Sequence, residues 1–188
     1  MHPLIVGIGA SAGGLAAFKT FLGNMPPEPG MAFVLVQHLA PDHKSLLVEL
    51  LGANSPLPVI TAADGIAVRS NNVYVMPPDA TLTIEAGILR LQKPAPDRPH
   101  RRPIDSFFVS LAEDQGDCAI GIILSGVGSD GSAGIRAIKE HGGLTFAQAE
   151  FDHHALSGMP NSAAETGMVD HVLPVEDIPS KLIEYSRH

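Results

Sequence analysis

Short apolar runs that end in glycine-rich or polar turns recur along this 188-residue chain. The runs at residues 4–8, 32–36 and 119–124 are continuous, which predicts strands that are covered on both faces, as in a parallel sheet. A segment with helical periodicity follows each of them. This alternation predicts an α/β fold built on a mostly parallel, doubly wound sheet.

Helices are predicted where apolar residues recur every three or four positions. The first begins at a turn formed by Gly13 and Gly14. The second begins at Asp42, its expected N-cap, and ends at Gly52, while the third ends at Gly116. The expected buried faces are Leu15, Phe18 and Leu22, then Leu46, Leu47, Leu50 and Leu51, and finally Ile104, Phe107, Phe108 and Leu111.

The middle of the chain has a different pattern. Residues 59–61 and 73–76 are predicted to be short strands. Residues 82–85 and 88–92 alternate between apolar and polar positions around a two-residue turn, which predicts a β-hairpin. We therefore expect the sheet to have an antiparallel hairpin at its edge.

The composition fits one domain and excludes several functions. A net charge of −8 and a pI of about 5.5 argue against a nucleic-acid partner, because the phosphates would be repelled over most of the surface. No apolar run is long enough to span a bilayer and no signal-peptide pattern is present, so we expect no membrane insertion and a cytoplasmic location. The single cysteine, Cys118, is expected to contribute to packing.

One basic cluster lies in a proline-broken loop at residues 93–103 and contains Arg98, His100, Arg101 and Arg102. It is expected to be a solvated loop, and the sharper alternative is a docking edge for an acidic partner. The histidines of the chain show no zinc-ligand spacing with cysteine or carboxylate, so no metal site is expected.

The first turn carries a serine in the pattern GxSxG, formed by residues 9–13. In such a nucleophile elbow, small flanking residues permit a strained turn that lifts the hydroxyl clear of the sheet, and the next helix directs its N–H groups to the same place. Ser11 is therefore a candidate nucleophile for acyl transfer. Two alternatives stay open: Gly7, Gly9 and Ala12 also fit a dinucleotide fingerprint, and the turn could be a tight corner with an idle serine.

Two further polar residues follow apolar strands, as Ser11 does. His38 comes after the run at residues 32–36, and Asp130 lies in the glycine-rich turn after residues 119–124. Because the carboxyl ends of parallel strands meet at one edge of a sheet, the three side chains are candidates for one site. They supply a nucleophile, a base and a carboxylate that orients the base, which is the set that serine acyl transfer requires.

The second glycine-rich turn also permits a nucleotide-binding interpretation. Gly126, Gly128 and Gly131 spell GxGxxG after a strand, and Glu150 follows about 20 residues later. Asp130 argues against this interpretation because its carboxylate would face a pyrophosphate. A dinucleotide-binding α/β domain stays as an alternative.

Six segments form a series over nearly the whole chain: GIGASAGG, VQHL, YVMPP, HRRPIDSFF, LSGVGSDGSAG and GMPNSAAETG. In this order they resemble the catalytic domain of the chemotaxis protein-glutamate methylesterase (CheB) family. The resemblance implies a three-layer α/β/α sandwich with Ser11, His38 and Asp130 as the catalytic triad. It also implies hydrolysis of γ-glutamyl methyl esters on the cytoplasmic helices of methyl-accepting chemoreceptors, with release of methanol, and deamidation of receptor glutamines, without a metal or organic cofactor.

Two positions depart from the usual pattern of that family. The family commonly has threonine after the nucleophile and methionine between the glycines of the later turn, whereas this chain has Ala12 and Val127. The oxyanion hole that the resemblance implies uses backbone N–H groups near these positions. If these positions act through their backbone N–H groups, catalysis should survive both changes, whereas a role for the threonine hydroxyl would alter activity or substrate preference.

The resemblance also bears on domain organisation. The family usually carries an N-terminal phosphorylatable receiver domain that covers the active site, whereas here the first motif begins almost at Met1. We expect residues 1–188 to form a single catalytic domain without a receiver domain, constitutively active, either by itself or within a larger protein such as a fusion with the receptor methyltransferase. The alternative from another class is a non-catalytic module that binds receptor helices or a fused partner.

Overall fold

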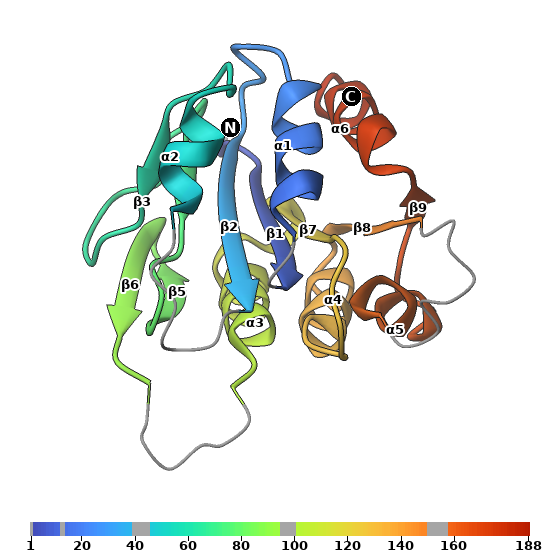
Figure 1. The fold of residues 1–188 in the computed structure, drawn as a ribbon. Coiled ribbons are helices and arrows are strands. Elements are labelled where there is room, and N and C mark those ends of the chain that lie inside the picture. Colours follow the sequence, from blue (N-terminus) through green and yellow to red (C-terminus); the bar gives the residue numbers. More distant parts are fainter. Residues whose placement is uncertain (1, 12–13, 39–45, 95–100, 150–157) are drawn as a thin grey trace.

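A seven-stranded sheet runs through the centre of the molecule (Figure 1). The strands follow the order β3-β4-β2-β1-β7-β8-β9, and all the neighbouring pairs are parallel. This arrangement confirms the parallel α/β sheet predicted from the apolar runs. The strands are β1 (Ile5–Ser11), β2 (Ala32–His38), β3 (Val59–Thr61), β4 (Val73–Val75), β7 (Ala119–Ile123), β8 (Leu144–Gln148) and β9 (His171–Leu173).

The structure is a computed structural model that describes residues 2–11, 14–38, 46–94, 101–149 and 158–188. In this part of the chain, no helix is both long and apolar enough to cross a membrane.

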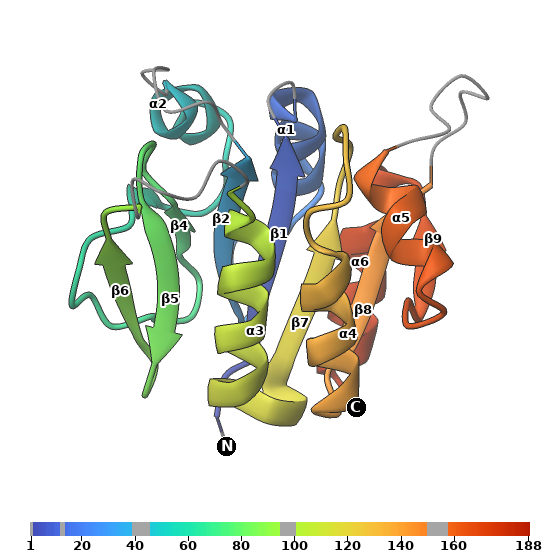
Figure 2. The same cartoon turned by 90° about the horizontal axis from the view of Figure 1, so that it is seen from below.

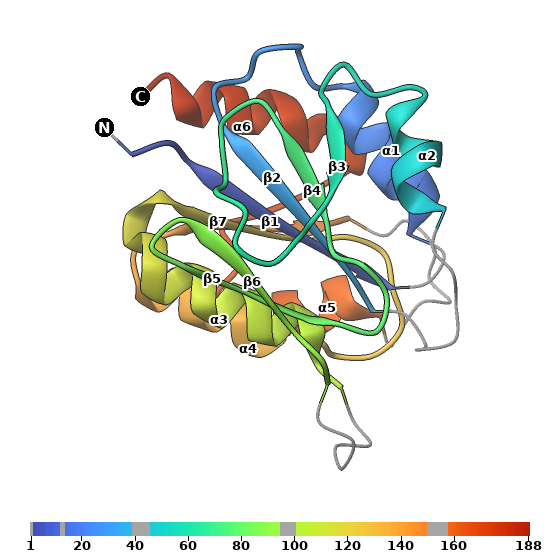
Figure 3. The same ribbon diagram turned by 90° about the vertical axis from the view of Figure 1, so that its left-hand side faces the viewer.

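Helices cover both faces of the sheet (Figure 3). Side chains alternate between the two faces along each strand. In β2, Phe33 and Leu35 pack in the core on one face, and Val34 and Val36 pack in the core on the other. The three-layer α/β/α sandwich is thus confirmed. One face is covered by α1 (Leu15–Gly23), α2 (Leu47–Gly52) and α6 (Ile178–Ser186), and the other by α3 (Pro103–Gln115), α4 (Ser132–Glu140) and α5 (Met159–Glu165), with short 3₁₀ turns at Gly116–Cys118 and Val175–Asp177.

The predicted hairpin forms from β5 (Thr81–Glu85) and β6 (Ile88–Gln92), but it is not an edge of the main sheet. It is a separate two-stranded antiparallel sheet that lies beside α3 (Figure 2). The last turn of α3 holds it, because the Asp114 carboxylate accepts the N–H groups of Ala86 at 2.6 Å and Gly87 at 3.0 Å. The buried apolar residues of the hairpin, Leu82, Ile84 and Leu89, belong to the core cluster that α3 shares with one face of the main sheet.

The helix α2 is shorter than the sequence predicts, and its expected N-cap, Asp42, lies outside the described residues. Leu47 and Leu51 are buried as predicted, but Leu46 is 63% exposed and Leu50 is 41% exposed. The prediction was wrong for these last two positions. Residues four apart form one row on a helix, and this short helix buries only one of its two leucine rows.

Cys118 lies between the surface and the core at the start of β7. Burial, reinforced by the charge of Asp117, raises the pKa of its thiol. The thiol therefore stays protonated at neutral pH, which agrees with a role in packing rather than in chemistry.

Candidate active site

The chain leaves β1 and β7 toward opposite sides of the sheet. After β1 it crosses through α1 to β2, whereas after β7 it crosses through α4 to β8. Because β1 and β7 are neighbours, their carboxyl ends form a topological switch point, which is where open α/β sheets bind their ligands. Figure 2 shows the loop between β7 and α4 at the same edge of the sheet as the start of α1.

Ser11 is the last residue of β1 and lies at this edge. In the parallel pairing of β1 with β2, its Cα partner is His38, the last residue of β2. The Ser11 backbone is held from both sides: its N–H donates to the Ser125 carbonyl oxygen at 3.4 Å, and its own carbonyl oxygen accepts from Gln37 Nε2 at 3.4 Å. The fold thus brings the predicted nucleophile and the backbone of the predicted base to adjacent positions, while the His38 side chain lies outside the described part of the structure.

The loop after β7 packs against the Ser11 side chain. The Val127 N–H donates to Ser11 Oγ at 3.3 Å. A Cβ at Gly126 would lie 2.7 Å from the same oxygen, so a glycine is needed for this close approach. The start of α5 supports the loop, because the Met159 N–H donates to the Gly126 carbonyl oxygen at 2.8 Å. Val127 is 84% exposed, and the group that it presents to Ser11 is its backbone N–H.

The other predicted oxyanion donor, Ala12, lies outside the described residues. The expectation that its backbone N–H contributes to an oxyanion hole stays a prediction.

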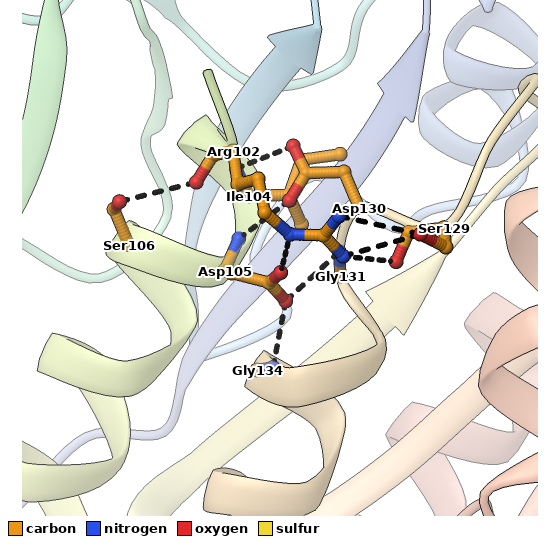
Figure 4. Close-up of polar contacts among 8 residues, drawn as sticks. All are labelled: Arg102, Ile104, Asp105, Ser106, Ser129, Asp130, Gly131 and Gly134. Atoms are coloured by element: carbon orange, nitrogen blue, oxygen red, sulfur yellow. Dashed lines mark hydrogen bonds and ion pairs between the residues drawn. The ribbon is translucent and has the colours of Figure 1, made fainter. Parts of the chain in front are cut away.

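Asp130 is only 4% exposed and lies in the loop between β7 and α4. Both of its carboxylate oxygens accept hydrogen bonds from the first turn of α3: Oδ2 from the Ile104 N–H at 3.1 Å, and Oδ1 from the Asp105 N–H at 3.0 Å (Figure 4). The positive end of the α3 dipole attracts the carboxylate at the same point. Asp130 therefore has a fixed orientation next to the switch point, and its action on the His38 ring stays a prediction.

Two residues near Asp130 were not singled out as site residues by the sequence. Asp105 is buried, and its Oδ1 accepts the N–H groups of Gly131 at 2.9 Å and Gly134 at 2.8 Å. Arg102 donates from Nε to Asp105 Oδ2 at 2.7 Å. This hydrogen bond, opposed by burial and supported by the charges of both aspartates, raises the pKa of Arg102. The sequence signal that could have pointed to these two residues is their position at a helix start, with Arg102 before Pro103 and Asp105 in the first turn.

In the described part of the basic cluster, both arginines also make contacts within the chain, while its interpretation as a solvated loop or a docking edge stays a prediction. Arg101 donates from Nη2 to the Ala80 carbonyl oxygen at 2.9 Å and lies 3.6 Å from the Asp79 carboxylate. Arg102 is bound to the start of α3 and to the loop before α4. Arg98 and His100 lie outside the described residues.

The start of α4 argues against a dinucleotide site. A pyrophosphate binds where N–H groups at a helix N-terminus are free. Here the N–H groups of Gly131 and Gly134 donate to Asp105, so a phosphate would meet a carboxylate instead. Glu150, the expected ribose ligand, lies outside the described residues.

No group of three or more His, Cys, Asp or Glu side chains is placed to share a metal ion within the described ranges. This doubly wound α/β domain presents a serine hydroxyl at the end of a central strand, with a loop N–H directed at it, which is how serine hydrolases present their nucleophile.

Comparison with known proteins identifies the family. The model of the CheB methylesterase family matches residues 6–182. The protein-glutamate methylesterase/protein-glutamine glutaminase 2 of Anaeromyxobacter dehalogenans (strain 2CP-C) is 37% identical over 183 residues, which are 97% of this chain and 53% of that protein. Protein-glutamate methylesterase/protein-glutamine glutaminase 1 of Myxococcus xanthus (strain DK1622) is 35% identical over 189 residues, which are 98% of this chain and 54% of that protein.

A solved structure agrees. The crystal structure of the Thermotoga maritima CheB methylesterase catalytic domain is 33% identical in sequence, with a TM-score of 0.86, and the match covers 98% of this chain and 100% of that one. The chain belongs to the CheB methylesterase family. It spans about half the length of the curated relatives that it matches.

Proposed function

We propose that this domain is a serine esterase that hydrolyses γ-glutamyl methyl esters of chemoreceptors and releases methanol. The observation that carries the proposal is the arrangement around Ser11. Its Cα partner on the neighbouring strand β2 is His38, and its Oγ accepts the Val127 N–H at 3.3 Å. Membership of the CheB methylesterase family supports the same activity. The names of the relatives support deamidation of receptor glutamines as a second reaction.

The reaction would take place in two stages on these groups. Ser11 Oγ attacks the ester carbonyl carbon while the His38 ring accepts the hydroxyl proton. The bond from the carbonyl carbon to the methoxy oxygen then breaks, and His38 returns the proton so that methanol leaves. Water attacks the acyl-enzyme with the same base, which releases the glutamate carboxyl group and restores the Ser11 hydroxyl. A glutamine substrate would lose ammonia in place of methanol.

Two other groups complete the proposed mechanism. Asp130 would hold the His38 ring in the correct tautomer and stabilise the imidazolium that forms during attack. The backbone N–H groups of Val127 and Ala12 would bind the oxyanion of the tetrahedral intermediate. Side chains and backbone groups of this chain therefore supply all the proton transfers and charge stabilisation in the scheme.

The proposed substrate also defines the proposed setting. We place the enzyme in the cytoplasm, acting on the cytoplasmic helices of methyl-accepting chemoreceptors during adaptation of chemotaxis signalling. A receiver domain of the phosphorelay and the receptor methyltransferase, fused or separate, are proposed as further partners. Residues 1–188 form the catalytic domain in this proposal, with no nucleic-acid partner and no insertion into the membrane.

The test is to incubate the purified protein with a methylated cytoplasmic receptor fragment and to measure methanol by gas chromatography. A fragment with glutamine at the same positions reports deamidation as released ammonia. Both products are expected without added phosphodonor. A folded protein that binds the fragment and releases neither product would be the non-catalytic module instead.

Substitutions at Val127 separate the role of its N–H from that of its side chain. Val127→Pro removes the N–H and is expected to lower kcat roughly 100-fold, the usual loss for one oxyanion donor. Val127→Met keeps the N–H and should leave kcat within about threefold of the wild-type value, because the side chain is in solvent. Methanol release at saturating substrate measures both. Equal losses in the two variants would show that the side chain matters and the N–H does not.

A further inference from the structure

Three consecutive residues of the loop before α4 are tied to the start of α3. Arg102 donates from Nη2 to the Ser129 carbonyl oxygen at 2.8 Å, and both of its terminal nitrogens lie 3.3 Å from Ser129 Oγ. Asp130 accepts two N–H groups from the first turn of α3. The Gly131 N–H donates to Asp105 at 2.9 Å. Asp130 itself and both of its chain neighbours, Ser129 and Gly131, are therefore hydrogen-bonded to the start of α3 (Figure 4).

These contacts make an exchange of caps between two helices. Asp130, from the loop before α4, caps the N-terminus of α3. Asp105, from the first turn of α3, caps the N-terminus of α4 through Gly131 and Gly134. Buried apolar side chains anchor α3 in the core. The hydrogen bonds of the exchange therefore hold the loop that carries Asp130 in a fixed position relative to α3.

Arg102 makes the exchange electrostatically favourable. Asp105 and Asp130 are two negative charges at neighbouring helix starts and would repel each other. The Arg102 guanidinium binds the Asp105 carboxylate and is also attracted by the charge of Asp130, which offsets this repulsion. Its forked donors bind Asp105 and Ser129 together, which one lysine ammonium cannot reproduce with the same geometry.

We propose that Arg102 and Asp105 are positioning residues that hold Asp130 in its working orientation. The proposal rests on the proposed function, in which Asp130 orients His38. Neither residue needs to touch the substrate. Loss of either should lower the rate of the chemical step and leave substrate binding unchanged, because only the alignment of Asp130 changes.

The test is a double-mutant cycle between Asp105→Asn and Asp130→Ala, with kcat and KM measured for the methylated receptor fragment. The asparagine cannot accept from both backbone N–H groups and from Arg102 at once, since one of its two terminal groups is a donor. Asp105→Asn is expected to lower kcat roughly 10- to 100-fold with KM unchanged. In the Asp130→Ala background it should have no further effect, because Asp105 acts through Asp130.

Asp114→Asn is the matched control. It lies on the same helix and its carboxylate also accepts two backbone N–H groups, at 2.6 Å and 3.0 Å, but in the hairpin turn at the opposite end of α3. Its kcat should stay within about twofold of wild type. A control that loses as much activity as Asp105→Asn would overturn the proposal, because the effect would then be general destabilisation of α3.

The outcomes separate this proposal from the proposed function. If Asp105→Asn lowers kcat by the same factor with and without Asp130, the positioning role is wrong even if Asp130 is essential. If Asp130→Ala alone retains full activity, the proposed triad itself fails. If circular dichroism shows that Asp105→Asn does not fold, Arg102→Lys takes its place in the same cycle, since the Arg102 side chain is 46% exposed. It should lower kcat several-fold only when Asp130 is present.

Discussion

Ser11→Ala is expected to lower kcat for methanol release by about 10⁴-fold or more, because the substitution removes the atom that forms the acyl-enzyme. The fold should persist. The variant loses one oxygen at the end of β1, and the strand keeps its backbone pairing with β2 and β7. Affinity for the methylated receptor fragment should be unchanged. Methanol release and fragment binding are measured on the same preparation.

Ser162→Ala is a suitable control for this change. Ser162 lies on α5 and donates its hydroxyl to the Gly128 carbonyl oxygen at 3.3 Å, so it contacts the same loop as Ser11. Its kcat should stay within about twofold of the wild-type value. A Ser11→Ala variant that keeps a tenth or more of the activity would exclude the acyl-enzyme mechanism.

Asp130→Asn is expected to lower kcat by about 10³- to 10⁴-fold, because an amide cannot stabilise the imidazolium and favours the wrong ring tautomer. It should also lower the free energy of unfolding by about 1–3 kcal/mol. Both carboxylate oxygens accept N–H groups of α3, and the new amide nitrogen would face one of those donors. Methanol release and urea denaturation measure the two effects.

Asp114→Asn is the control that separates the loss of kcat from the loss of stability. Its carboxylate likewise accepts two backbone N–H groups, so the same substitution should give a comparable loss of stability. Its activity should be unchanged. If Asp130→Asn behaves like this control and keeps its kcat, then Asp130 only caps α3 and the proposed mechanism needs another group to orient His38.

Most of the architecture could be predicted from the chain because the pattern of each segment was unambiguous. The apolar runs that form β1, β2 and β7 were continuous, and the period of α3 was regular up to Gly116. The errors came where local pattern does not decide burial. Leu46 and Leu50 have the spacing of a buried helical row, yet α2 buries Leu47 and Leu51 and packs Val48 against the same core. The hairpin was recognised, but its attachment to α3 through Asp114 was not.

The surroundings of Asp130 show the limit of sequence reasoning at the site. Arg102 stands among other basic residues, which suggested a solvated loop. Nothing near it in the sequence indicates that it binds Asp105 and also Ser129, which is 27 residues away. These contacts become visible only when the starts of α3 and α4 are seen side by side (Figure 4).

The family resemblance rests on six sequence motifs in their order along the chain. The amino-acid sequence also predicts the succession of strands and helices and the three candidate residues Ser11, His38 and Asp130. These depend on periodicity and turn chemistry, which are properties of residues close together in the chain. Tertiary contacts alone establish that Ser11 pairs with His38, that Ser11 Oγ accepts the Val127 N–H from 116 residues away, and that α3 and α4 exchange their caps. These contacts follow from the register of the sheet and the packing of helices on it, which no local pattern encodes.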